Sequence, residues 1–195
     1  MMRPLAMSKS GSSAVEFALV LPLLLIFLFG IIDVGRLMWT WNKAEKATQM
    51  GVRYAVVTDM VPATLASRDY TDNAYGNVPG GDPVPIGLFS STVCTNTSPC
   101  SNGLGYNATA FAGIAARVAL YLPEARPANV RVQYDNAGLG FAGDPNGPDV
   151  SPLVTVSLTG LRFQPLLFTV FGSSIALPDF RASLTGEDFS GTVSN

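Results

Sequence analysis

Residues that could perform chemistry are few in this sequence and do not cluster. Histidine is absent, and it is the side chain most used for proton transfer near neutral pH and for binding zinc. The acidic residues are scattered through turns and one long helical segment, and no serine, lysine or cysteine lies in an activating pattern such as GxSxG or SxxK. No phosphate-cradling loop surrounds Gly80 and Gly81. The sequence therefore predicts no enzyme, no cofactor and no metal site.

The two cysteines are the residues whose spacing does indicate chemistry. Cys94 and Cys100 are the only cysteines, and they enclose the short loop TNTSP. Their spacing fits neither a CxxC redox motif nor a four-ligand zinc site. In a segment outside the cytoplasm such a pair indicates a structural disulfide, and we predict a Cys94–Cys100 bond.

The apolar residues are concentrated near the amino terminus. Residues 17–32 read FALVLPLLLIFLFGII and carry no charge between Glu16 and Asp33. A helix from Ser12 to Asp33 would be about 32 Å long, close to the ~30 Å hydrocarbon core of a bilayer. The preceding segment holds basic residues and no acid, which favours a cytoplasmic amino terminus. We predict a single-pass protein of the cytoplasmic membrane, with its carboxy-terminal part outside.

The helix is expected to continue beyond the membrane. An amphipathic pattern with spacings of three and four residues follows the apolar run, and Pro62 limits its end to about Asp59. Pro22 lies inside the predicted span, where neighbouring groups can satisfy the hydrogen bonds that it breaks. Gly30 is one of several small residues that permit close helix packing.

The remaining sequence predicts a small mixed domain, so the expected fold class is α+β with a long amino-terminal helix and an antiparallel sheet. Residues 107–122 have helical periodicity, and 166–171 (LLFTVF) form an apolar segment too short to span a membrane. We expect that segment in the core or against the long helix. Strands are predicted at 129–135, 153–160, 174–178 and 180–185. The expected organisation is a leader at 1–11, a stem helix at 12–60, a loop-rich segment at 61–106 and a head at 107–195.

Glu16 is the acidic residue that most needs an explanation, because a carboxylate beside an apolar run is unfavourable in lipid. The simplest one is a position near the start of a helix, where the helix dipole and the headgroup region favour an acid. A second follows from the leader, which ends at Gly11. Cleavage there would make Ser12 the new amino terminus, and its positive amine would lie within reach of Glu16 in the same or an adjacent subunit.

Gly11, Glu16 and Phe17, placed ahead of an apolar helix, resemble the cleavage region of type IV pilin precursors. More specifically, residues 11–56 resemble the amino-terminal region of TadE-like proteins, the minor pilins or pseudopilins of tight-adherence pilus machines. Five landmarks carry the resemblance in order: AVEFA at 14–18, LP at 21–22, GIID at 30–33, GR at 35–36 and GVRYA at 51–55.

The resemblance implies a structural subunit of a tight-adherence pilus that contributes to surface adhesion. A prepilin peptidase would remove residues 1–11, Glu16 would set the register of the subunit, and Phe17, Pro22 and Gly30 would pack in a helix bundle. The implied partners are lipid of the inner membrane, the peptidase, other pilins and tight-adherence assembly proteins, and the pilus outside the cell is a further location.

Two alternatives share the same stem. The chain could be an uncleaved, signal-anchored module whose head binds a ligand outside the cytoplasm, or a pseudopilin of a secretion system. Nucleic acid is not an expected partner, because 12 basic and 14 acidic residues give a formal charge of −2.

The role of Glu16 can be tested by substitution. We expect Glu16→Ala to insert into the membrane normally but to enter the pilus poorly, because the freed amine would lose its acidic partner in a medium of low dielectric. Membrane fractionation and quantification of the protein in sheared pili measure the two effects. Glu45→Ala, at equal protein level, is the matched control, and wild-type incorporation of Glu16→Ala would refute the role.

Overall fold

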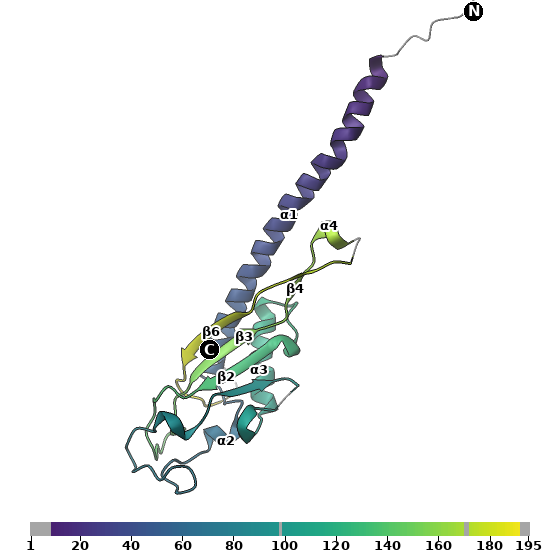
Figure 1. Ribbon diagram of the computed structural model, residues 1–195. Helices are drawn as coiled ribbons and strands as arrows, with labels where there is room; N and C mark the ends of the chain where they lie inside the picture. The colour runs from purple at the N-terminus through teal and green to yellow at the C-terminus, as the bar shows by residue number, and fades with distance from the viewer. Residues whose placement is uncertain (1–8, 98, 170–171, 192–195) are drawn as a thin grey trace, which may run out of the picture. The chain divides into compact units, whose positions relative to one another are not determined.

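The computed structural model describes residues 9–97, 99–169 and 172–191. Its contacts divide the chain into two compact units. The stem unit comprises Met1–Trp39 and Arg162–Ile175, and the head unit comprises Thr40–Leu161 and Ala176–Asn195. One long helix, α1 (Lys9–Ala55), contributes residues to both units (Figure 1).

Helix α1 confirms the predicted long amino-terminal helix, although its limits differ. It begins at Lys9, so the backbone is already helical at Gly11 and Ser12, and it continues through Pro22. It ends at Ala55 rather than near Asp59 because the backbone tightens there. Val57 N–H donates to the carbonyl of Tyr54, which also accepts a hydrogen bond of 2.8 Å from the Thr58 hydroxyl. The Thr58 hydroxyl thus binds the Tyr54 carbonyl, which would accept a backbone N–H if the helix continued for a further turn.

The head unit is built on a four-stranded antiparallel sheet with the order β1-β2-β3-β6. In one row Cys94, Val132, Val156 and Ala182 lie side by side. Alternate residues of β2 point to the buried face, which is the pattern expected of a sheet with one covered side. The strands are β1 (Thr92–Thr95), β2 (Val130–Asp135), β3 (Leu153–Leu158) and β6 (Phe180–Thr185).

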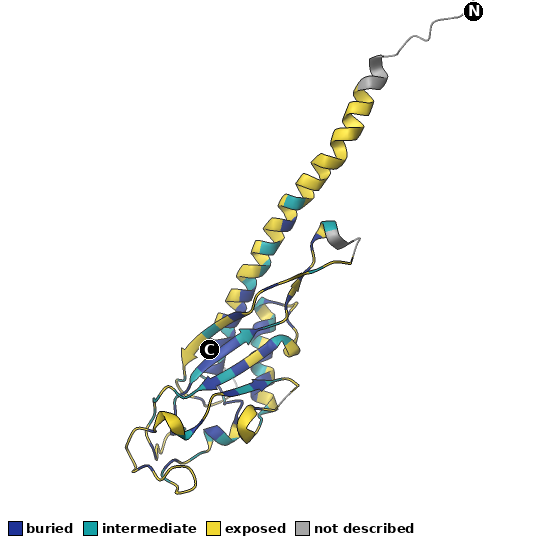
Figure 2. Cartoon of the chain, in the orientation of Figure 1, coloured by how far each residue is buried: buried dark blue, intermediate teal, exposed yellow. Residues whose placement is uncertain are grey.

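Helix α3 (Ala108–Tyr121) covers the sheet together with the end of α1. The side chain of Asn107 caps α3 by accepting a hydrogen bond from Ala110 N–H, and Phe111, Ile114 and Val118 are buried on its inner face. The core of the head therefore lies between two helices and one sheet, whereas the first half of α1 is exposed (Figure 2).

One strand was missed in the sequence, and one strand prediction needs correction. Strand β1 was not predicted, because its four residues lie in the loop-rich segment and are ordered by pairing with β2. The predicted strand 174–178 is only β5 (Ile175–Ala176), and it pairs with β4 (Arg162–Phe163) in a separate two-stranded sheet instead of joining the main one. Pro178 lacks an N–H group and separates β5 from β6.

Short elements connect these parts. They are the helical turns α2 (Ala63–Ala66) and α4 (Leu166–Thr169) and the 3₁₀ turns η1 (Ile86–Leu88), η2 (Ser101–Gly103) and η3 (Pro127–Asn129).

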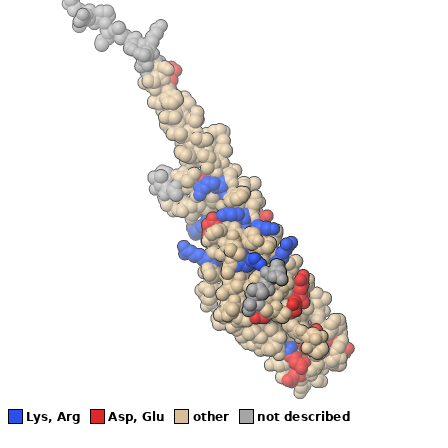
Figure 3. All heavy atoms as spheres, turned by 180° about the vertical axis from the view of Figure 1, so that it is seen from behind, with Lys and Arg blue, Asp and Glu red and all other residues tan. Residues whose placement is uncertain are grey.

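Charge is unevenly distributed over the head unit. Lysine and arginine gather toward the end at which α1 enters it, and acidic residues gather toward the opposite end (Figure 3). Lys43 of α1 forms an ion pair of 2.9 Å with Glu124. Burial raises the pKa of Glu124, but the hydrogen bond and charge of Lys43 outweigh that effect, so its pKa is lowered.

Gly51 of α1 lies against both α3 and the sheet, and it gives a test of this packing. A Cβ atom there would lie 2.8 Å from Val118 Cγ2 and 3.2 Å from Val156 Cγ1. Both valines are buried and stiff at χ1. We expect Gly51→Ala to lower the free energy of unfolding by about 1–3 kcal/mol, measured by denaturant titration in detergent. Gly87→Ala, where a Cβ meets nothing within 4 Å, is the control, and equal stability of the two variants would contradict this packing.

Candidate functional site

The first half of α1 exposes a continuous run of apolar side chains. Phe17, Leu19 and Leu23 are exposed, Leu19 by 75%. Within the described residues, α1 is the one helix long and apolar enough to cross a membrane, and none of its most apolar 18-residue window is buried. A buried core helix of a soluble protein would show the opposite. Such a surface requires lipid or other apolar helices around it.

The predicted cleavage residues lie in the first turns of α1. Ser12 and Glu16 are four residues apart in a continuous helix, so they lie on the same side, separated by about 6 Å along the axis. The side chain of Glu16 is exposed. The amine with which Glu16 is predicted to pair arises only on cleavage at Gly11, and the pairing therefore stays a prediction.

The predicted packing residues are placed on the surface of α1. Phe17 and Pro22 are exposed. Gly30 is half-buried, and a Cβ built on it would meet no atom within 4 Å. Gly30 thus leaves an open notch in the helix surface, and its predicted role in helix packing stays a prediction.

Asp33 has partners in a distant part of the sequence that were not predicted. It is only 7% exposed, and its carboxylate accepts hydrogen bonds from the backbone N–H groups of Leu166 (2.8 Å) and Leu167 (3.2 Å) at the start of α4. Arg36 completes the cluster with a 3.0 Å ion pair to Asp33. The carboxylate therefore anchors α4 to α1 within the stem unit.

Arg36 also connects the anchor to the strand that precedes α4. Its guanidinium donates to the carbonyl of Gln164 at 3.4 Å and lies 5.4 Å from the centre of the Phe163 ring. The sequence signal for this cluster was weak. It consisted of an acid at the end of an apolar run, an arginine one turn later, and a short apolar segment more than 130 residues away.

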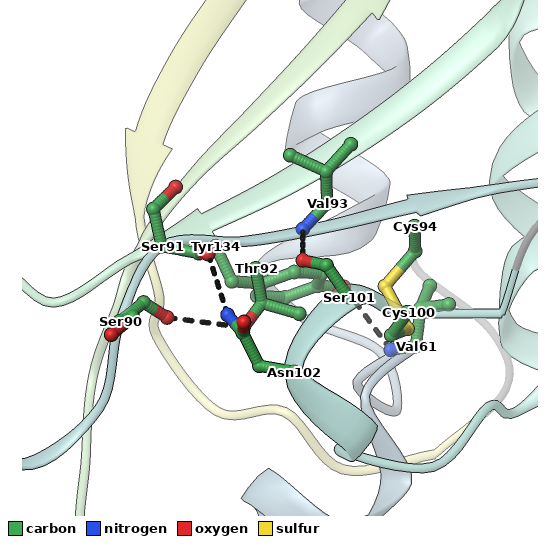
Figure 4. The surroundings of a disulfide bond; sticks show 10 residues. All are labelled: Val61, Ser90, Ser91, Thr92, Val93, Cys94, Cys100, Ser101, Asn102 and Tyr134. Atoms are coloured by element: carbon green, nitrogen blue, oxygen red, sulfur yellow. Dashed lines mark hydrogen bonds between the residues drawn. A yellow bond between two sulfur atoms is a disulfide. The ribbon is translucent and has the colours of Figure 1, made fainter.

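The disulfide between Cys94 and Cys100 confirms the predicted pairing, with Cα atoms 4.1 Å apart. The turn η2, which directly follows Cys100, bonds to β1 and to the residue before it: Ser101 Oγ accepts from Val93 N–H at 2.9 Å, and the Asn102 amide donates to the Ser91 carbonyl at 3.0 Å (Figure 4). The bridge and these two hydrogen bonds thus fix η2 to β1.

Tyr134 connects the sheet to the chain that leaves α1. Its hydroxyl accepts a hydrogen bond of 3.1 Å from Val61 N–H, and its side chain is fully buried. Burial raises the pKa of Tyr134 far above its ordinary value, despite the opposing effect of the Val61 hydrogen bond. The hydroxyl therefore stays protonated and structural.

Residues 11–53 match the family model of TadE-like proteins. This confirms the resemblance on which the sequence analysis settled. No curated protein and no solved structure matches the chain. The TadE-like segment contains Gly11, Glu16 and both sides of the Asp33–Arg36 pair, whereas α4 and the disulfide lie outside it.

TadE-like proteins are a structural, pilus-associated family. Within the described residues, no group of three or more His, Cys, Asp or Glu side chains could hold a metal ion.

One glycine motif outside the TadE-like segment was overlooked in the sequence. Residues 138–143 read GLGFAG, which has the spacing of a dinucleotide-binding loop. That loop requires a strand before it and a helix after it, but this one joins β2 to β3. Its glycines serve the backbone instead: Gly140 has φ +113°, and a Cβ there would overlap the Asp149 carbonyl. The motif is therefore structural.

The stabilising effect of the disulfide is testable. Because the bridge closes a short loop, replacing both Cys94 and Cys100 with alanine should lower the free energy of unfolding by about 2 kcal/mol. Fluorescence of Trp41, whose ring lies 5.0 Å from that of Phe180 in the head, reports unfolding of the full chain in detergent. Asn73→Ala, on an exposed loop, is a control for the effect of substitution. A double variant as stable as the wild type would contradict the proposed contribution.

Proposed function

We propose that this protein is a membrane-inserted, pilin-like subunit of a tight-adherence pilus machine. The observation that carries the proposal is the TadE-like helix α1, whose first half has an exposed apolar surface and whose second half is part of the head core. Ala44 and Ala47 on α1 are fully buried in the head. One helix thus contributes both a lipid-compatible surface and part of the core of a folded domain.

The head lies outside the cytoplasm in this proposal. The Cys94–Cys100 disulfide supports that side, because disulfides persist in oxidising compartments and are rare in the cytosol. The basic leader that carries Arg3 and Lys9 remains inside. The protein then crosses the inner membrane once, with its head outside.

Processing at Gly11 prepares the stem for assembly. A prepilin peptidase cuts between Gly11 and Ser12, and the new amine pairs with Glu16 in the same or a neighbouring subunit. The pair allows the stem to leave lipid for a bundle of similar helices, because the apolar contacts are kept and the acid is neutralised. Other pilins and the assembly proteins of the machine are the partners, and surface adhesion is the outcome.

An uncleaved anchor with a ligand-binding head is the second candidate. It is favoured by the helical backbone at Gly11 and Ser12, since a peptidase must unwind a helix to reach the bond that it cuts. The two candidates differ in the mass of the purified protein.

Amino-terminal sequencing and intact mass spectrometry decide between them. In cells with the peptidase we expect a mature chain that begins at Ser12. Gly11→Val should keep its leader, because a bulky residue replaces the glycine at the cut, whereas the matched variant Gly35→Val should be processed normally. A wild-type chain that retains residues 1–11 in pilus-producing cells would show the uncleaved anchor instead.

A further inference from the structure

We propose that α4 is a second membrane contact, which lies in the outer part of the bilayer beside α1 and borders a groove that takes lipid acyl chains. This inference rests on the proposed function, because it requires α1 to span the membrane with the head outside. Its evidence lies entirely within the stem unit.

The depth of α4 in the membrane follows from the residues of α1 that lie beside it. Leu167 borders an apolar groove of about 490 Å³ whose other walls belong to α1. Those walls include Ile26 and Phe27, which lie in the uncharged run of residues 17–32. Ile26 precedes Asp33 by seven residues, or about 10 Å along the helix axis. If Asp33 lies at the membrane surface, Leu167 lies beside a part of α1 that is surrounded by hydrocarbon.

The backbone of α4 is adapted to such a position. Main-chain N–H groups in hydrocarbon need acceptors within the protein. The Asp33 carboxylate accepts from the N–H groups of both Leu166 and Leu167, and Pro165, just before them, has no N–H group to satisfy. The start of α4 can therefore enter an apolar medium without unpaired donors at these three positions.

The charge of the anchor is also compensated. An isolated aspartate near the hydrocarbon core is strongly unfavourable, but Asp33 forms an ion pair with Arg36, which also donates to the Gln164 carbonyl and lies against the Phe163 ring. The cluster presents an aromatic ring and two leucine side chains around a neutral pair. Leu166 remains 42% exposed, so its side chain is available to lipid.

Lipid acyl chains are the occupant that the groove favours. The residues that line it are apolar, and Gly30 forms an open notch among them. The groove is continuous with the exposed apolar surface of α1, for which lipid is the proposed surrounding. An acyl chain is flexible and thin enough to follow such a surface, and it makes no demand for hydrogen bonds.

The test uses spin labels on the full chain in phosphatidylcholine nanodiscs that hold one copy each. The native cysteines form a disulfide, so a thiol-specific label reacts only with an introduced cysteine. Leu166→Cys reports on α4, Leu23→Cys on the middle of the span, and Gly147→Cys on an exposed loop of the head. Collisions with oxygen, which concentrates in lipid, and with a nickel chelate, which stays in water, give the depth of each label.

We expect the label at position 166 to favour oxygen over the nickel chelate, as at position 23 and unlike position 147. Adding Asp33→Ala should increase the collision rate of the nickel chelate at position 166 several-fold and leave position 23 unchanged, because only the anchor is lost. Asp33→Asn, which still offers one oxygen acceptor, should have a smaller effect.

A label at 166 that is as accessible to the nickel chelate as the label at 147, while the label at 23 stays in lipid, would overturn this inference and leave the membrane span intact. If the label at 23 is also accessible to water, the proposed span fails as well. An acyl-chain spin label whose relaxation is unchanged by a paramagnetic label at Phe27→Cys would exclude lipid from the groove. A groove filled only when a second copy shares the disc, seen as dipolar broadening at Phe27→Cys, would replace lipid with another subunit.

Discussion

The structure depends on a single constraint on α1. The first half of this helix must suit an apolar medium, and its second half must pack in the core of the head. The first half of α1 exposes apolar side chains that water cannot accommodate, and the second half buries small residues against α3 and the sheet. Because the helix is continuous, the hydrogen-bonded backbone carries no break between the two media. The same helix therefore contributes an exposed apolar surface to the stem unit and, around Gly51, part of the packed core of the head unit.

Asp33 lies at the end of the uncharged apolar run of α1. A carboxylate at this boundary would be a liability in an unadorned anchor helix, yet here it becomes the acceptor for a segment that returns from the far part of the sequence. The charge of Asp33 is balanced by that of Arg36, and the carboxylate accepts hydrogen bonds from the backbone of α4. A polar residue at the end of a span can thus organise structure around it instead of simply marking the limit of the apolar run.

The elements that could be predicted from the sequence are those that a local pattern of residues determines. The run at 17–32 specified the exposed stem, the helical periodicity of 107–122 specified α3, and the strand pattern of 180–185 specified β6 with its observed limits. Contacts between distant residues were not predictable in the same way. Strand β1 exists only because β2 pairs with it, and the acceptor role of Asp33 depends on a chain reversal that places α4 beside α1. The cleavage role of Gly11 and Ser12 rests on family resemblance.

The loop closed by Cys94 and Cys100 has a consequence for solubility at high density. Strand β1 is at the margin of the sheet, and an open margin offers unsatisfied main-chain groups to strands of other molecules. Ser101 and Asn102 already occupy such groups at Val93 and Ser91. A bilayer confines its proteins to two dimensions and so raises the frequency of their encounters. Where the bridge holds Ser101 and Asn102 beside β1, the main-chain groups that these residues bind are not available to a strand of another molecule.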